Sequence, residues 1–176
     1  MKWRRPRLPA EARKAAADLV AEAGGEVRVL AWGCDGEQYA VGFPGHLAYD
    51  DDGTGWRLLA WHRIVRGGWD KETRRLSWVD YDGDRVELPL ADPGALPELF
   101  KERVEASILV RRQVVVPGTK HGVVVVGRRV LGADPAVLEW HAQLNKGSSW
   151  SVPGAREAAE EALASLKAEY DPYGGG

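Results

Sequence analysis

The sequence has little sulfur and few phenylalanines: one cysteine, one methionine and two phenylalanines in 176 residues. A lone cysteine, Cys34, cannot form an intramolecular disulfide, which excludes a disulfide-stapled scaffold and indicates a reducing compartment. No apolar run approaches the roughly 20 residues that a membrane-spanning helix needs. Asp18 and Glu22 interrupt the alanine-rich stretch near the N-terminus, so we expect no secretory signal. These absences predict a cytoplasmic protein without a membrane partner.

A strong charge of either sign is also missing. Lys and Arg number 24 against 26 Asp and Glu, which leaves a formal net charge of −2 at pH 7. No global field therefore draws the chain to nucleic acid or to an anionic membrane. The hydrophobic share of 44% and the charged share of 28% are typical of a globular protein. We expect a mobile basic arm over residues 1–8, one α+β domain over 9–170 and a disordered tail over 171–176.

The sequence contains none of the common catalytic motifs. It has no P-loop, no GxGxxG after a strand, no GxSxG, no HExxH and no CxxC. The aspartates at 50–52 and 80–84 lack the glycine and glutamate positions of a calcium loop, so we interpret both as solvated turns. Cys34 adjoins Asp35 and Glu37, which disfavour a thiolate. We expect no cofactor and no metal.

Apolar periodicity predicts three helices and about nine strands. A 3.6-residue period marks helices over 9–23 and 154–170, and a central helix that begins near Pro93 and Pro97 and buries Leu96 to Ile108. Glycine, proline and aspartate turns separate the strands, which run in blocks and so predict antiparallel sheet in an α+β fold or small barrel. We expect strands at 26–32, 39–43, 46–49, 56–64 continuing through a bulge at 67–68 to Trp69, 76–81, 86–90, 113–116, 122–129 and 137–144. The last three of these strands could extend the first sheet or form a separate layer.

Four consecutive stretches carry a resemblance to a known fold. They are YAVGFPGHLAYD, WRLLAWHRI, GGWDKETRRLSWVDYDGDRVELPL and the helix LPELFKERVEASILV. In this order they resemble the pleckstrin-homology-like and GRAM-like small barrels of bacteria, and uncharacterised proteins of high-GC Gram-positive bacteria with the same WH-x-I, WD and LPEL-x-x-ERV-x-AS succession. The resemblance places a small antiparallel barrel or curled sheet at about 26–110, with appended strands and a helix over 111–170.

The resemblance also implies a class of function. Members of this superfold mostly bind peptides, proteins or lipid headgroups and are rarely enzymes. Phosphoinositide-binding members place basic residues in the first hairpin loop, whereas here that loop carries Asp35 and Glu37. These acidic side chains repel a phosphate, so the resemblance favours a protein or peptide ligand over a lipid.

Tryptophans and the basic arm are the candidate binding residues. Trp61 and Trp78 alternate with polar residues and are expected in the core, whereas Trp3 and Trp150 lie in polar surroundings where a tryptophan can anchor a partner. The arm could contact nucleic-acid phosphates, or it could be a solvated terminus. Its basic residues are Lys2, Arg4, Arg5 and Arg7.

Two histidines suggest a weak catalytic alternative. His62 and His141 each follow a tryptophan on a predicted strand, and Glu139 lies two residues from His141 on the same strand face. If these strands were adjacent, the three side chains could form an acid–base or metal site. The competing interpretation, which we prefer, is that each histidine is a half-buried structural residue.

The sequence thus favours a non-enzymatic protein-binding or scaffold module. Its partner would be another protein or a second copy of the chain. The first alternative is a nucleic-acid- or ribosome-associated protein that uses the basic arm. The second is a small hydrolytic or metal-assisted enzyme that uses His62, Glu139 and His141.

Overall fold

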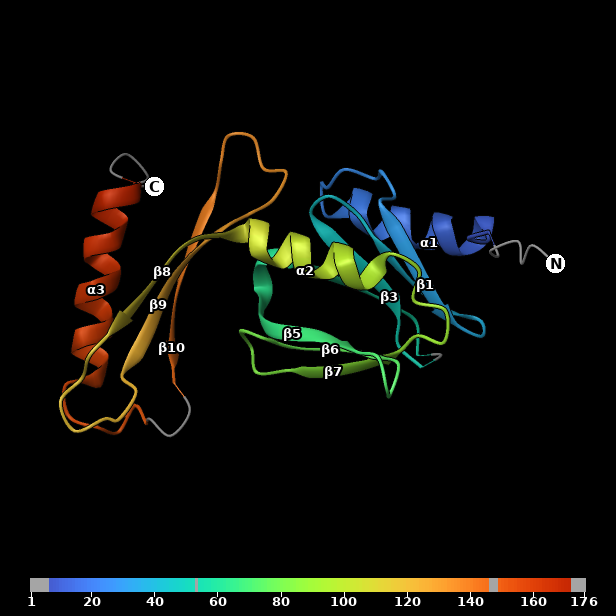
Figure 1. Cartoon of the computed structure of the whole chain (residues 1–176). Helices are drawn as coiled ribbons and strands as arrows, with labels where there is room; N and C mark the ends of the chain where they lie inside the picture. The colour runs from blue at the N-terminus through green and yellow to red at the C-terminus, as the bar shows by residue number, and fades with distance from the viewer. Residues whose placement is uncertain (1–6, 53, 146–148, 172–176) are drawn as a thin grey trace. The chain divides into compact units, whose positions relative to one another are not determined.

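A computed structural model describes residues 7–52, 54–145 and 149–171, and it divides the chain into two compact units (Figure 1). Unit 1 is Met1–Glu105 and unit 2 is Ala106–Gly176. The described residues form three α-helices and ten strands in three antiparallel sheets. The predicted α+β, antiparallel class is confirmed. The sequence predicts about nine strands, one fewer than the described residues form, and the sheets do not close into a barrel. Among the described helices, none is both long and apolar enough to cross a membrane.

Helix α1 (Ala10–Glu22) covers one face of the first sheet. Its buried side is Ala12, Ala16 and Val20, at the spacing of one helical face. Gly24, at a φ of 74°, follows the helix in the left-handed conformation that glycine tolerates best. The core cluster under α1 combines residues of the helix with residues of the sheet: Ala16, Val20, Val41, Phe43 and Ala48.

The first sheet is a meander in the order β1-β2-β3-β4. Its strands are β1 (Ala31–Asp35), β2 (Gln38–Gly42), β3 (His46–Asp50) and β4 (Trp56–Ala60). The prediction of a strand at 26–32 was wrong by several residues. The ladder closes directly on a two-residue turn, with Asp35 opposite Gln38, so the first strand must continue to Asp35.

The long strand expected from Trp56 to Trp69 was also wrong. A 3-10 turn, η1 (Trp61–Arg63), interrupts it, so that β4 stays in the first sheet while β5 (Ile64–Asp70) starts the second. The Trp61 indole N–H donates to the carbonyl of Phe43 at 2.8 Å, and this buried hydrogen bond holds the turn. The irregularity in pairing lies between Ile64 and Arg66, and not at Gly67 and Gly68.

The second sheet has the order β5-β6-β7, with β6 (Arg75–Asp80) in the centre and β7 (Arg85–Pro89) at an edge. Helix α2 (Leu96–Ser107) packs Phe100 against Trp61 of η1 and Trp78 of β6. The Phe100 ring lies 5.9 Å from that of Trp61 and 6.0 Å from that of Trp78, and Trp78 meets Tyr49 of β3 edge-on at 5.1 Å. This aromatic chain joins the two sheets and the helix, and it confirms Trp61 and Trp78 as core residues.

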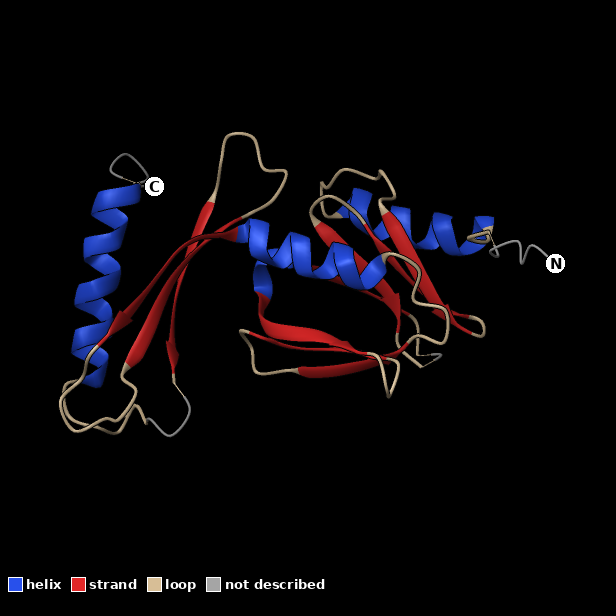
Figure 2. Ribbon diagram, viewed as in Figure 1, coloured by secondary structure: helices blue, strands red, loops and turns tan. Residues whose placement is uncertain are grey.

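Unit 2 consists of one sheet and one helix (Figure 2). The sheet has the order β10-β9-β8 and is separate from the sheets of unit 1. The last three strands therefore do not extend the first sheet. Helix α3 (Ala155–Tyr170) packs on this sheet through Ala155, Ala159 and Leu166. The first strand begins earlier than the predicted 113–116, because it follows α2 without a loop. The strands are β8 (Ile108–Val114), β9 (Val123–Arg129) and β10 (Leu138–Leu144).

Candidate functional site

A large hollow in unit 1 is a cleft of about 610 Å³ between strands of its two sheets. The first sheet contributes residues of β3, β4 and the loop between them, and the second contributes residues of β6, β7 and their connecting turn. We call this hollow the edge cleft. Its lining residues are Tyr49, Asp51, Arg57, Leu58, Leu59, Trp78, Asp80, Asp84, Arg85, Val86 and Glu87.

Strand β4 presents an open edge to the cleft. Asp51 N–H donates to the carbonyl of Gly55, and Trp61 N–H donates to that of Gly45. These pairs show that odd-numbered residues form the hydrogen-bonded pairs of the β3–β4 ladder. Odd-numbered residues of β4 therefore bond to β3, and the even-numbered residues Trp56, Leu58 and Ala60 direct their backbone N–H and C=O outward. Among the described residues, no loop or turn hydrogen bond reaches the outward backbone groups of Trp56 or Leu58. Ala60 is the N-cap of η1, so its carbonyl accepts a hydrogen bond within that turn and its N–H is the group left for a partner.

Strand β7 presents a second open edge. Asp80 N–H donates to the carbonyl of Asp84 and Leu90 N–H to that of Arg74, so the even-numbered residues of β7 bond to β6. The outward positions are Arg85, Glu87 and Pro89. Proline lacks the N–H donor and is confined to such outward positions of an edge strand. Pro89 is thus the one sequence signal that could have identified β7 as an edge.

The wall of the edge cleft is rich in carboxylates. Four acidic side chains line it against two arginines: Asp51, Asp80, Asp84 and Glu87 against Arg57 and Arg85. Asp51 forms an ion pair with Arg57 at 3.0 Å, and Glu87 pairs with Arg75 at 3.5 Å. Carboxylates therefore outnumber guanidinium groups around the hollow.

One carboxylate of the β6–β7 turn, that of Asp80, is held by backbone donors. Oδ1 of Asp80 accepts the N–H of Asp82 at 2.9 Å and that of Asp84 at 3.0 Å. The predicted turn at 80–84 is confirmed. Because these hydrogen bonds fix the Asp80 carboxylate, the acidic wall is built into the hairpin.

Tyr49 lines the edge cleft, and the pKa of its phenol responds to the charges around it. Its side chain is 5% exposed. Burial raises the pKa of its phenol, and the nearby carboxylates of Asp51, Asp80 and Asp84 raise this pKa further, against an opposing contribution from Arg57. Tyr49 therefore lies in a desolvated part of the cleft where three of the four charged groups that act on it are carboxylates, and carboxylates favour a cationic group over an anionic one.

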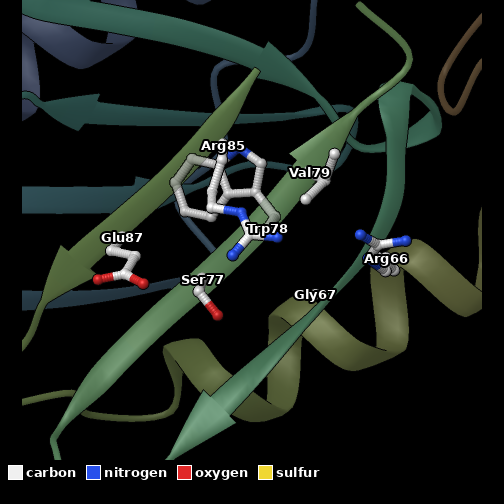
Figure 3. A pocket seen from close by; sticks show the side chains of 7 residues that line it. All are labelled: Arg66, Gly67, Ser77, Trp78, Val79, Arg85 and Glu87. Carbon is white, nitrogen blue, oxygen red and sulfur yellow. The ribbon is translucent and has the colours of Figure 1, made fainter. Parts of the chain in front are cut away.

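A smaller hollow of about 290 Å³ lies on the second sheet and shares Trp78, Arg85 and Glu87 with the edge cleft (Figure 3). In the register, Arg66 lies opposite Val79, and Val79 lies opposite Arg85, so the two arginines flank one valine across three strands. Ser77 and Gly67 complete the lining. This hollow carries no buried polar group that would define a ligand, so we assign it no role.

The structure brings together two of the three residues of the catalytic alternative. In β10, Nε2 of His141 lies 3.2 Å from Oε2 of Glu139, and both side chains are partly buried. His62 is 7% exposed, and it belongs to unit 1, so it shares no site with His141 within either unit. One of its titratable neighbours is His46, and burial, together with the proximity of His62, lowers the pKa of His46. Among the described residues no group of three His, Cys, Asp or Glu side chains could hold a metal ion.

The other candidate binding residues fall partly outside the structure. Trp3, Arg4 and Arg5 lie outside the described residues, and Arg7 is exposed just before α1. Trp150 packs against the core of unit 2, with the guanidinium of Arg156 5.5 Å from its ring centre. Leu8 packs against the core under α1.

Comparison of the chain with protein-family models, with curated proteins and with solved structures gave no match.

Proposed function

We propose that the chain is a non-enzymatic protein-binding module that captures an extended segment of its partner in the edge cleft. The observation that carries this proposal is the pair of open strand edges, β4 and β7, that border one hollow. An exposed edge is a template for another strand, and many recognition domains bind peptides by strand addition.

The dimensions of the edges suit a short peptide. Each strand has five residues, so each can pair with about 17 Å of extended chain at the usual rise per residue. Outward hydrogen-bonding groups come from three positions on β4 and from three on β7; Ala60 supplies only its N–H and Pro89 only its carbonyl. Backbone groups give affinity without sequence preference, and the half-buried Leu58, Leu59 and Val86 side chains add apolar contact.

We further propose that unit 1 has the pleckstrin-homology-like arrangement that its sequence resembles. Four strands in one sheet, three in the next and a following helix support this assignment. A binding role is the common use of that superfold, so the proposed fold and the proposed function agree.

Proline substitution at outward positions tests strand addition. Ala60→Pro removes one outward N–H of β4 at a residue whose φ of −79° already suits proline. Glu87→Pro does the same on β7, two residues before the natural Pro89. We expect each variant to keep its fold and to lose about tenfold in affinity, from one hydrogen bond and the bulk of the ring. The probe is a 12-residue peptide selected from a random displayed library on the full chain, measured by fluorescence anisotropy.

Glu87→Gln is the matched control, because it removes the charge of Glu87 and keeps its backbone N–H. Its affinity for the same peptide should stay within about threefold of the parent value. Unchanged binding by both proline variants, with normal circular dichroism, would contradict strand addition at these edges.

A further inference from the structure

The edge cleft has a charge pattern that selects among extended segments. Of its two arginines, Arg57 is neutralised by Asp51 at 3.0 Å. Glu87 likewise has Arg75 at 3.5 Å. Asp80 and Asp84 form no ion pair within the described part of the chain, so two carboxylates remain against the single guanidinium of Arg85.

These carboxylates gather at one end of the cleft. Asp51 follows β3, opposite the start of β4, and Asp80 and Asp84 flank the turn that leads into β7. The phenol of Tyr49 lies within electrostatic reach of all three aspartates. A segment lying along the edges would therefore meet its strongest negative potential where both edge strands begin.

The chemistry of the partner follows from this placement. We propose that the edge cleft takes an extended, basic segment of another protein, with a lysine or arginine seated by Asp80 and Asp84 and with apolar side chains against the half-buried Leu59 and Val86. The inference rests on the proposed strand addition and adds the charge of the partner to it. An acidic or phosphorylated segment would meet repulsion from the same aspartates.

The test uses the library-selected peptides with the full chain and two charge-matched double variants. Asp80→Asn with Asp84→Asn removes two charges from the cleft, while the amide oxygen introduced at position 80 can still accept the turn hydrogen bonds. Asp70→Asn with Glu72→Gln removes two charges from the β5–β6 turn, where Oδ1 of Asp70 likewise accepts the N–H of Glu72 at 2.8 Å and of Thr73 at 3.2 Å. Neither Asp70 nor Glu72 lines the edge cleft.

We expect the selected peptides to be enriched in lysine and arginine. Their affinity should fall about tenfold in the cleft variant, change less than about threefold in the control variant, and weaken as salt rises. Replacing the basic residues of the best peptide by glutamate should abolish its binding.

The outcomes separate this inference from the proposed function. The selected peptides could be neutral or acidic, bind Ala60→Pro weakly and bind the Asp80→Asn, Asp84→Asn variant as well as the parent. That result would overturn the basic partner and leave strand addition standing. Basic peptides whose binding ignores both proline variants would overturn strand addition and this inference together, as would a library that yields no binder. An equal loss of peptide affinity in the two double variants would show a general effect of charge. It would also overturn the placement of a basic residue by Asp80 and Asp84.

Discussion

Phe100→Ala is expected to lower the free energy of unfolding of unit 1 by about 4 kcal/mol, within the range seen when a buried phenylalanine is truncated. Phe100 is 2% exposed, and its ring contacts the rings of Trp61 and Trp78. Truncation leaves a cavity between these two rings and removes the aromatic contacts that α2 makes with η1 and with β6. Typical domains are stable by about 5–15 kcal/mol, so a loss of this size is a large share of the stability of unit 1.

Urea denaturation followed by tryptophan fluorescence measures this loss. Phe100→Leu is the control, because it keeps most of the buried volume and should cost less than half as much. An effect of Phe100→Ala below about 1 kcal/mol would mean that the aromatic chain does not hold the two sheets together.

Gly122→Ala should destabilise unit 2 by about 3 kcal/mol or more, since it combines a steric clash with backbone strain. Gly122 has a φ of 63°, and a Cβ there would lie 2.0 Å from the carbonyl oxygen of Val114. That oxygen belongs to the end of β8, whose Val114 pairs with Val123. The clash cannot be relieved by a side-chain rotation, so the β8–β9 ladder must open.

Gly118→Ala separates the two contributions. Gly118 has a φ of 83° but open space around it, with Val152 Cγ1 at 3.8 Å as the sole neighbour within 4 Å among the described residues. It should cost about 1–2 kcal/mol from strain alone. Hydrogen–deuterium exchange read by mass spectrometry on peptides from β8 to β10 measures both variants, and equal losses would show that the clash is absorbed.

Local patterns in the sequence predicted the helices well and the strands less evenly. The alanine stripe of α1 and the apolar face of α2 follow from helical periodicity, which needs no knowledge of a partner. The alternation from Trp56 to Trp69 is equally clear, but a period of two does not show where a strand leaves one sheet for another. That break depends on the hydrogen bond from Trp61 to Phe43, which is 18 residues away.

The candidate site was harder to predict for the same reason. An open edge is defined by which strand fails to find a neighbour, and no single strand encodes that information. Pro89 marks β7 as an edge, whereas nothing in Trp56–Ala60 marks β4. Some of the tryptophans and histidines that stand out in the sequence have a structural role, because Trp61, Trp78 and His62 are buried.

Amide hydrogen exchange, followed by NMR residue by residue, tests the two open edges most directly. In the free protein we predict that outward amides exchange at least about tenfold faster than their inward neighbours, and that a saturating selected peptide slows them. The outward amides are Trp56, Leu58, Ala60, Arg85 and Glu87, and the inward ones compared with them are Arg57, Leu59, Val86 and Leu88. Outward amides that are already protected in the free protein, or that stay unprotected with peptide bound, would contradict the account.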